Sequence, residues 1–241
     1  MHVLTLALLC AKNDCTRNVF LCNAVYIMSE YFPHTYNKKS EHALIKENFM
    51  QSFEELARAA RTCRRFDESV PVAAATLRRM LDTARIASSC SNRQPLRYIT
   101  ASTPEICGRL FPHIQWAGAL EWKGPEQGER PTGYILICSA RPESKFVYYD
   151  TAIAAETLQL HATDLGLGCC MINNFARDPV REILDVPEDI IPLLLLAFGA
   201  PVEERRIADA KIDDDLRYWR DEHNVHHVPK LTLDQVLLAE K

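Results

Sequence analysis

Apolar positions after residue 50 follow two kinds of spacing, one typical of helices and one typical of buried strands. Apolar residues three and four positions apart share one face of a helix, so this spacing predicts amphipathic helices. We expect Asp150 to cap the start of the longest helix and Gly166 to end it. The predicted helices cover Phe53–Ala60, Val72–Ala84, Asp150–Leu165 and Pro179–Leu184.

Short, continuously apolar runs lie between these helices and predict strands buried in a sheet. Turn residues bound the runs, and we expect Gly199–Pro201 to stop the last strand. Because helices and strands alternate along the chain, the pattern predicts a sheet covered by helices. The predicted strands cover Arg97–Ala101, Tyr134–Ser139, Cys169–Ile172 and Leu193–Phe198.

The two ends of the chain lack this regular pattern. Residues 1–49 begin with a short apolar run and continue as polar and aromatic sequence with no clear period. We therefore expect residues 1–49 to be an extension outside the fold and residues 50–241 to form one domain. Residues 203–224 are highly charged, and residues 231–238 predict a short docking helix.

Composition narrows the class of protein. The 241 residues are 47% hydrophobic and 25% charged with a net charge of -4, which is ordinary for a soluble protein and gives no footprint for nucleic acid. The longest apolar run, Ile190–Phe198, is too short to span a bilayer, so no membrane partner is expected. The nine cysteines include no C-x-x-C pair, and we interpret them as reduced thiols of a cytoplasmic protein.

Several common chemistries are excluded by missing motifs. The chain has no G-x-G-x-x-G, no P-loop, no G-x-S-x-G and no H-E-x-x-H. The histidine cluster of His223, His226 and His227 has no carboxylate at a diagnostic spacing, so we expect no metal site there.

A polar loop follows the second predicted helix. Ser88–Gln94 contains three serines, Asn92 and Gln94, and Pro95 closes it. Hydroxyls, amides and free backbone N–H groups are what a polar heterocycle needs for hydrogen bonding. A structural serine-rich turn has the same composition, and both interpretations stay open.

A basic segment precedes the same helix. Arg61, Thr62 and Arg64 offer guanidinium groups and a hydroxyl, which suit a phosphate because guanidinium forks make bidentate contacts. Arginine-rich segments are also common as solvated faces, so the segment alone does not decide.

The segment Leu165–Phe175 joins the longest helix to an apolar strand. A helix C-cap at Gly166 followed by a core strand would account for it without a ligand. Cys169 and Cys170 are neighbours in that strand, so their side chains point to opposite faces and a disulfide between them would be strained. We expect at least one of the two to pack in the core.

Taken in order, these segments resemble the nitroreductase family of flavin enzymes. Ser89–Pro95 is similar to the family's S-x-x-N-x-Q-P loop, and Gly166–Gly168 is similar to its G-L-G loop after the central helix. The family's opening motif, R-R-S-x-R-x-F, is matched by Arg61, Thr62, Arg64 and Phe66.

The family also supplies late basic residues, often as P-K-R, and Lys230 matches the lysine. Two basic residues of the family pattern are replaced in this chain, one by Ala60 and one by Leu231. Two of the phosphate contacts that the family pattern implies are therefore absent.

The resemblance implies an α+β fold, a three-layer sandwich whose central, mostly antiparallel sheet is covered by helices, in an intertwined homodimer. It implies one FMN in each of two clefts, each lined by both chains. NADH or NADPH would give a hydride to flavin N5, and a nitroaromatic, quinone or similar acceptor would take it in a ping-pong reaction.

The resemblance also implies roles for individual residues, with no catalytic side chain because flavin N5 carries the chemistry. The phosphate would be held by Arg61, Thr62, Arg64 and Lys230. The ribityl chain or the polar edge of the ring would be held by Ser89, Asn92 and Gln94. The ring would be supported by Met171, Ile172, Asn173 and Asn174.

Two alternatives stay open. The replacements at Ala60 and Leu231 are compatible with a paralogue of the same dimeric fold that binds flavin weakly or not at all. The pattern is also compatible with a family member that uses reduced FMN for another reaction, such as dehalogenation.

Overall fold

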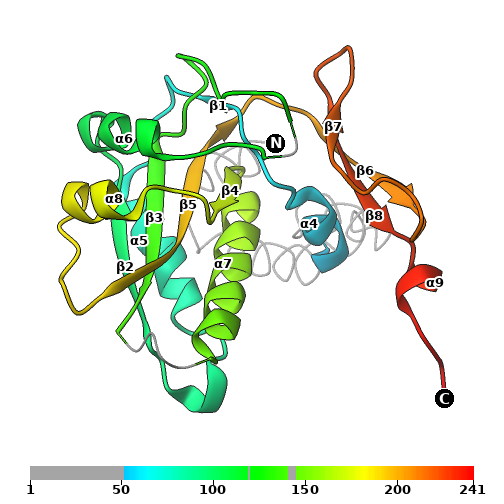
Figure 1. The fold of residues 1–241 in the computed structure, drawn as a ribbon, viewed down its shortest axis with the longest axis horizontal. Helices are drawn as coiled ribbons and strands as arrows, with labels where there is room; N and C mark the ends of the chain where they lie inside the picture. The colour runs from blue at the N-terminus through cyan, green and yellow to red at the C-terminus, as the bar shows by residue number, and fades with distance from the viewer. Residues whose placement is uncertain (1–51, 119, 141–144) are drawn as a thin grey trace, which may run out of the picture. The chain divides into compact units, whose positions relative to one another are not determined.

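A computed structural model describes residues 52–118, 120–140 and 145–241. The predicted extension over residues 1–49 lies outside the described residues and stays a prediction. The described part is an α+β fold with a five-stranded sheet and a separate three-stranded sheet near the C-terminus (Figure 1). Among its helices, none combines the length and the apolar composition needed to cross a bilayer.

Every strand pair of the five-stranded sheet is antiparallel, as expected. The longest strand, β5 (Ile191–Pro201), pairs with β3 (Gly133–Ser139), β4 (Gly168–Ile172) and β1 (Phe66–Asp67). The sheet continues from β3 to β2 (Leu96–Ala101). All residues of β3 are buried, which explains its continuously apolar sequence.

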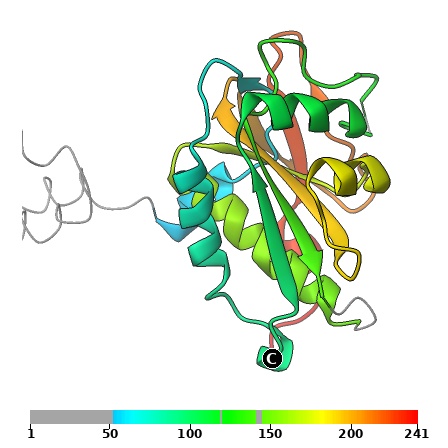
Figure 2. The same ribbon diagram turned by 90° about the vertical axis from the view of Figure 1, so that its left-hand side faces the viewer.

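Helices cover both faces of this sheet, so the fold has three layers. Figure 2 shows α6 and α8 on the face toward the viewer. Along β3, Leu136 packs in the cluster with α6 and α8, whereas Ile135 packs in the cluster with α5 and α7, because side chains alternate across a strand. The helices are α4 (Phe53–Ala59), α5 (Ala74–Ala84), α6 (Pro104–Leu110), α7 (Val147–Asp164), α8 (Arg177–Ile183) and α9 (Leu233–Val236).

The four predicted helices and four predicted strands are present with shifted bounds, and two local predictions are wrong. Helix α7 begins at Val147, so Asp150 lies in its first turn and is not the cap. The Asp150 carboxylate instead binds the loop before β2. Strand β5 does not stop at Gly199, because Gly199–Pro201 pair with β4 and β1. Gly166 does end α7, with a φ of 74°.

The charged tail forms a sheet that the sequence pattern did not predict. Strands β6 (Arg205–Ala210) and β8 (His226–Leu231) are parallel, and β7 (Trp219–Arg220) pairs with β8. The predicted docking helix is reduced to α9, and Leu233 and Val236 on it are exposed in the single chain.

Cys169 and Cys170 pack in opposite core layers, as expected for neighbours in a strand. Both are free thiols. Burial raises the pKa of Cys170 to about 11 and raises that of Cys169 well above its ordinary value. Both thiols are therefore protonated at neutral pH and serve as packing groups.

Two glycines face each other in the sheet, Gly168 on β4 and Gly199 on β5. A Cβ added at Gly168 would lie 2.6 Å from the Cys63 sulfur, and a Cβ at Gly199 would lie 2.9 Å from Phe66 Cβ. Both glycines let the segment Cys63–Phe66 pack directly against the strands.

We predict that Gly168→Ala lowers the free energy of unfolding by about 1–3 kcal/mol, because the added methyl group overpacks the core. Chemical denaturation measures this loss. The matched control is Gly108→Ala on α6, where no atom lies within 4 Å of the added Cβ. The control is expected to be neutral or to stabilise by up to about 1 kcal/mol, and equal stability of the two variants would contradict the packing argument.

Candidate functional site

The basic segment that includes Arg61, Thr62 and Arg64 runs along the edge of β4. Thr62 forms a parallel bridge with Cys169, and the Cys63 backbone N–H donates to the Cys169 carbonyl at 2.8 Å. The amide of Gln159 on α7 donates to the Ala60 carbonyl at 3.0 Å. Backbone and helix contacts therefore fix this segment against the core.

The side chain of Arg61 is half-buried, and only some of its N–H groups have hydrogen-bond partners in the described part of the chain. One terminal nitrogen donates to the Ala57 carbonyl at 2.6 Å. Its Nε is buried and has no hydrogen-bond partner in the described part of the chain. A buried N–H without a partner is costly, and an anion bound here would satisfy it.

The side chain of Arg64 is held by groups from the C-terminal sheet. Its guanidinium carbon lies 4.5 Å from the centre of the Tyr218 ring, and its Nη1 lies 3.2 Å from Nε2 of His226. These contacts occupy one edge and one face of the guanidinium, so Arg64 has fewer free N–H groups than the sequence suggests.

Glu203 is a fully buried carboxylate beside this segment. It accepts a hydrogen bond from the backbone N–H of Arg64, and its other oxygen lies 2.9 Å from Nη2 of Arg220. The Arg220 guanidinium also stacks 4.2 Å from the Trp122 ring centre. Breaking such a buried pair would leave an uncompensated charge, so Glu203 ties the basic segment to the C-terminal sheet.

His226 belongs to the same cluster. Burial, with smaller effects of the neighbouring Arg64 and Arg220, lowers its pKa to about 4 against the opposing effect of Glu203. At neutral pH the ring is uncharged, so its Nε2 can accept a hydrogen bond from Arg64.

The other histidines do not assemble a metal site with it. His227 pairs with Asp221 at 2.8 Å and stacks on Trp219, whereas His223 is exposed. Within the residues that the structure describes, no three His, Cys, Asp or Glu side chains are grouped to hold a metal ion.

The polar loop lies at the start of α7. The Ser89 hydroxyl donates to Asp150 at 3.0 Å and accepts from the Gln94 backbone N–H at 3.0 Å. The Gln94 side chain donates to the Asn92 side chain at 3.0 Å, and both residues are exposed with positive φ. A small cavity of about 130 Å³ opens between this loop, β2 and α7.

The third group follows β4. Met171 is half-buried, Ile172 is buried, and Asn173 and Asn174 are exposed at the end of the strand. The Asn174 carbonyl accepts from the Gln115 backbone N–H at 3.0 Å, and the two side-chain amides are also bonded.

Two of these groups lie together in one chain. The Thr62–Cys169 bridge and the Cys63–Cys169 backbone hydrogen bond hold the basic segment beside the first half of β4, and Met171 follows two residues later on the same strand. The positive charge of Arg64 also lowers the pKa of the Cys170 thiol, against the larger effect of burial. The basic segment therefore lies beside β4, two residues before the group Met171–Asn174 begins.

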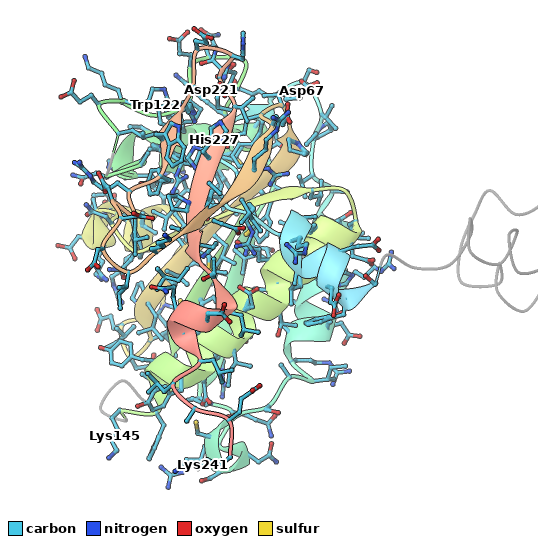
Figure 3. The ribbon with its side chains drawn as sticks, turned by 90° about the vertical axis from the view of Figure 1, so that its right-hand side faces the viewer. Asp67, Trp122, Lys145, Asp221, His227 and Lys241 are labelled. Carbon is cyan, nitrogen blue, oxygen red and sulfur yellow. The ribbon has the colours of Figure 1, made fainter. Side chains whose placement is uncertain are left out.

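The polar loop lies apart from both. Asp150 contacts Ser89, whereas Gln159, nine positions later on α7, contacts Ala60. Nine helical residues span about 14 Å. Figure 3 shows Lys145, just before α7, at the opposite end of the molecule from Trp122 and His227.

Lys230 is also apart from the basic segment. It is exposed on β8 opposite Asp209, whereas Arg205 at the start of β6 is opposite His226. Four residues of a strand span about 13 Å. Within one chain, Lys230 is therefore not grouped with Arg61 and Arg64.

A comparison with known protein families identifies the family of this chain. Residues 57–200 match the family model described as the nitroreductase family. The chain belongs to the nitroreductase family. Its antiparallel sheet and two helical layers are the fold that the family resemblance implied.

Named relatives of this nitroreductase-family chain are similar over part of its length. An Archaeoglobus fulgidus protein provisionally named NADH dehydrogenase/NAD(P)H nitroreductase is 24% identical over 142 residues, which are 56% of this chain and 77% of that protein. A Staphylococcus aureus NADPH-dependent oxidoreductase is 35% identical over 86 residues, and this match spans only 33% of its length.

Solved structures share the fold. A nitroreductase family protein from Clostridium difficile 630 is 29% identical with a TM-score of 0.50, covering 63% of this chain and 86% of that one. An FMN-dependent nitroreductase from Clostridium difficile R20291 is 23% identical with a TM-score of 0.53, covering 69% and 97%.

Sequence reasoning missed Glu203, Arg205 and Arg220 because it predicted no strand in residues 203–224. The residues of β6 alternate only weakly between buried and exposed positions, so their pattern gave little signal. The pairing of β6 with β8 across the tail decides which charged residues face the core.

We predict that lowering the pH from 7 to 5 destabilises the protein by about 1–2 kcal/mol through His226 alone. Its pKa falls from 6.5 to about 4 on folding, so the unfolded chain takes up the proton first as pH drops. Stability from this residue is complete above about pH 6.5 and is lost between pH 6.5 and 4.

Urea unfolding at several pH values tests this prediction. His226→Gln should remove this part of the pH dependence, whereas His223→Gln, an exposed control, should keep it. Identical pH profiles for wild type and His226→Gln would contradict the assignment.

Proposed function

We propose that this nitroreductase-family chain is an oxidoreductase that binds FMN and passes a hydride from NADH or NADPH to a small-molecule acceptor such as a nitroaromatic or quinone. The observation that carries the proposal is the bridge between Thr62 and Cys169, which sets the basic segment two residues along β4 from Met171–Asn174. FMN carries a phosphate and a flat, polar ring. It therefore requires a phosphate-binding segment close to residues that can support the ring.

The donors present fit an FMN phosphate. Arg61 offers a buried, unpaired N–H, Thr62 offers a hydroxyl, and the backbone here is held rigidly by β4. When bound, FMN supplies the atom that accepts and gives the hydride, its N5. The exposed amides of Asn173 and Asn174 lie where they can orient the polar edge of the ring and bind substrate.

The separation of the polar loop from the basic segment supports a homodimer. The ribityl chain of FMN is bonded directly to its phosphate, so groups about 14 Å apart along α7 would not hold both. In a dimer, Ser89, Asn92 and Gln94 of one copy would complete the site of the other. The exposed apolar residues Leu233 and Val236 of α9 support burial against a second copy.

We extend the proposal to the rest of the chain. Residues 1–49 would lie outside the FMN-binding domain of residues 50–241. The cysteines whose state the structure describes are free, which supports a cytoplasmic protein.

A second candidate is a paralogue of the same fold that binds flavin weakly. Ala60 replaces an expected arginine and is itself buried, so no cation can enter there without rearrangement. Arg64 is already engaged by Tyr218 and His226. These two observations favour the weakly binding paralogue.

The full chain, purified without added cofactor, is expected to show flavin absorbance that bleaches when NADH or NADPH is added without oxygen. Visible spectroscopy measures both steps. Protein that stays colourless after incubation with FMN would overturn the proposal and support the paralogue.

Complementation between variants tests the shared site. Arg61→Gln and Asn92→Ala should each weaken FMN binding, because each damages both sites of a homodimer. Mixed dimers of the two variants should regain one intact site, since both defects then fall in the other site. FMN binding that stays low after mixing and subunit exchange would contradict a site shared between copies.

A further inference from the structure

Arg205 is a half-buried arginine that the proposed site does not yet include. It is the first residue of β6, and its Nη1 donates to the backbone carbonyl of Arg61 at 2.8 Å. That carbonyl belongs to the same peptide segment as Thr62, which bridges β4. The guanidinium therefore lies against the backbone of the basic segment.

The charge of Arg205 acts on this segment. It lowers the pKa values of the buried Cys63 and Cys169 thiols, against the larger effect of burial, and these are the two residues joined by the backbone bond at the bridge. Within the described ranges, Arg205 forms no ion pair with a carboxylate, whereas its neighbour Arg206 pairs with Glu204. The positive charge of Arg205 is therefore available to an anion.

The family pattern has an arginine at position 60 that this chain lacks, so one cation expected at the phosphate is missing. Ala60 carries no charge, and Lys230 lies about 13 Å along the β6–β8 ladder from Arg205. Arg220, another nearby arginine, is neutralised by Glu203 and covered by Trp122. Arg205 lies beside the basic segment and forms no ion pair in the described part of the chain, so it suits the role of the arginine that is missing at position 60.

We propose that Arg205 binds the phosphate of FMN together with Arg61 and Thr62, supplying the cation that is missing at position 60. This inference rests on the proposed FMN function. A guanidinium has five N–H groups, so the nitrogen bonded to the Arg61 carbonyl leaves others for phosphate oxygens. The same bond holds the fork in place beside the unpaired Nε of Arg61.

The preference of the full-length apoprotein for FMN over riboflavin tests Arg205 directly, because the two ligands differ only in the phosphate. Flavin fluorescence quenching gives both affinities. Arg205→Gln is expected to lower the preference about tenfold or more while riboflavin binding stays the same. Arg206→Gln, the neighbour on the same strand, is the matched control and should keep the wild-type preference.

Arg205→Lys covers the case in which Arg205→Gln binds neither flavin. Lysine keeps the charge but loses the fork, so the preference should fall severalfold. An unchanged preference in Arg205→Lys, or in an Arg205→Gln variant that still binds riboflavin, would overturn the assignment. Wild-type protein that binds neither flavin would instead overturn the proposed function itself.

Discussion

The backbone hydrogen bond between Cys63 and Cys169 fixes the geometry on which the rest of the candidate site depends. It attaches the basic segment to β4 through an isolated parallel bridge. The pairing is possible because Gly168 and Gly199 leave room for Cys63 and Phe66. Core packing thus decides where the arginines lie, because a side chain at either glycine would push the segment away from the start of β4.

Charge balance around Glu203 is the second constraint. A buried carboxylate is tolerated because Arg220 pairs with it and a backbone N–H donates to it. His226 stays neutral among these cations because burial and two arginines oppose its protonation. The two arginines outweigh the single carboxylate, so the cluster keeps a net positive charge, and the neutral His226 does not repel the arginines. A net positive charge suits a neighbouring site for an anion.

Local pattern was enough to predict the elements that pack in the core. Strand β3 is buried on both faces and α7 has a repeating apolar face, so both are visible in the sequence. The end of β5 was not predictable, because Gly199 and Pro201 usually end strands and continue here only by pairing with β4 and β1.

Charged residues were harder to place. Asp150 was expected at a helix cap, yet it is buried and binds a loop about 60 residues earlier in the chain. The parallel pairing of β6 with β8 brings Arg205 to the basic segment, and no local pattern of residues 203–224 reports that pairing. The motif matches at Arg61, Thr62 and Arg64 selected this segment as a candidate site but could not show which of its N–H groups already have partners.

The length of α7 has a thermodynamic consequence if the site is shared between two copies. Each bound cofactor would then contact both subunits, so cofactor binding and subunit association would be linked equilibria. Dilution would release the cofactor from protein that is otherwise folded, and added cofactor would tighten the association of subunits. In such a dimer, the separation of Asp150 and Gln159 along α7 would make the concentration of the protein itself a determinant of its cofactor content.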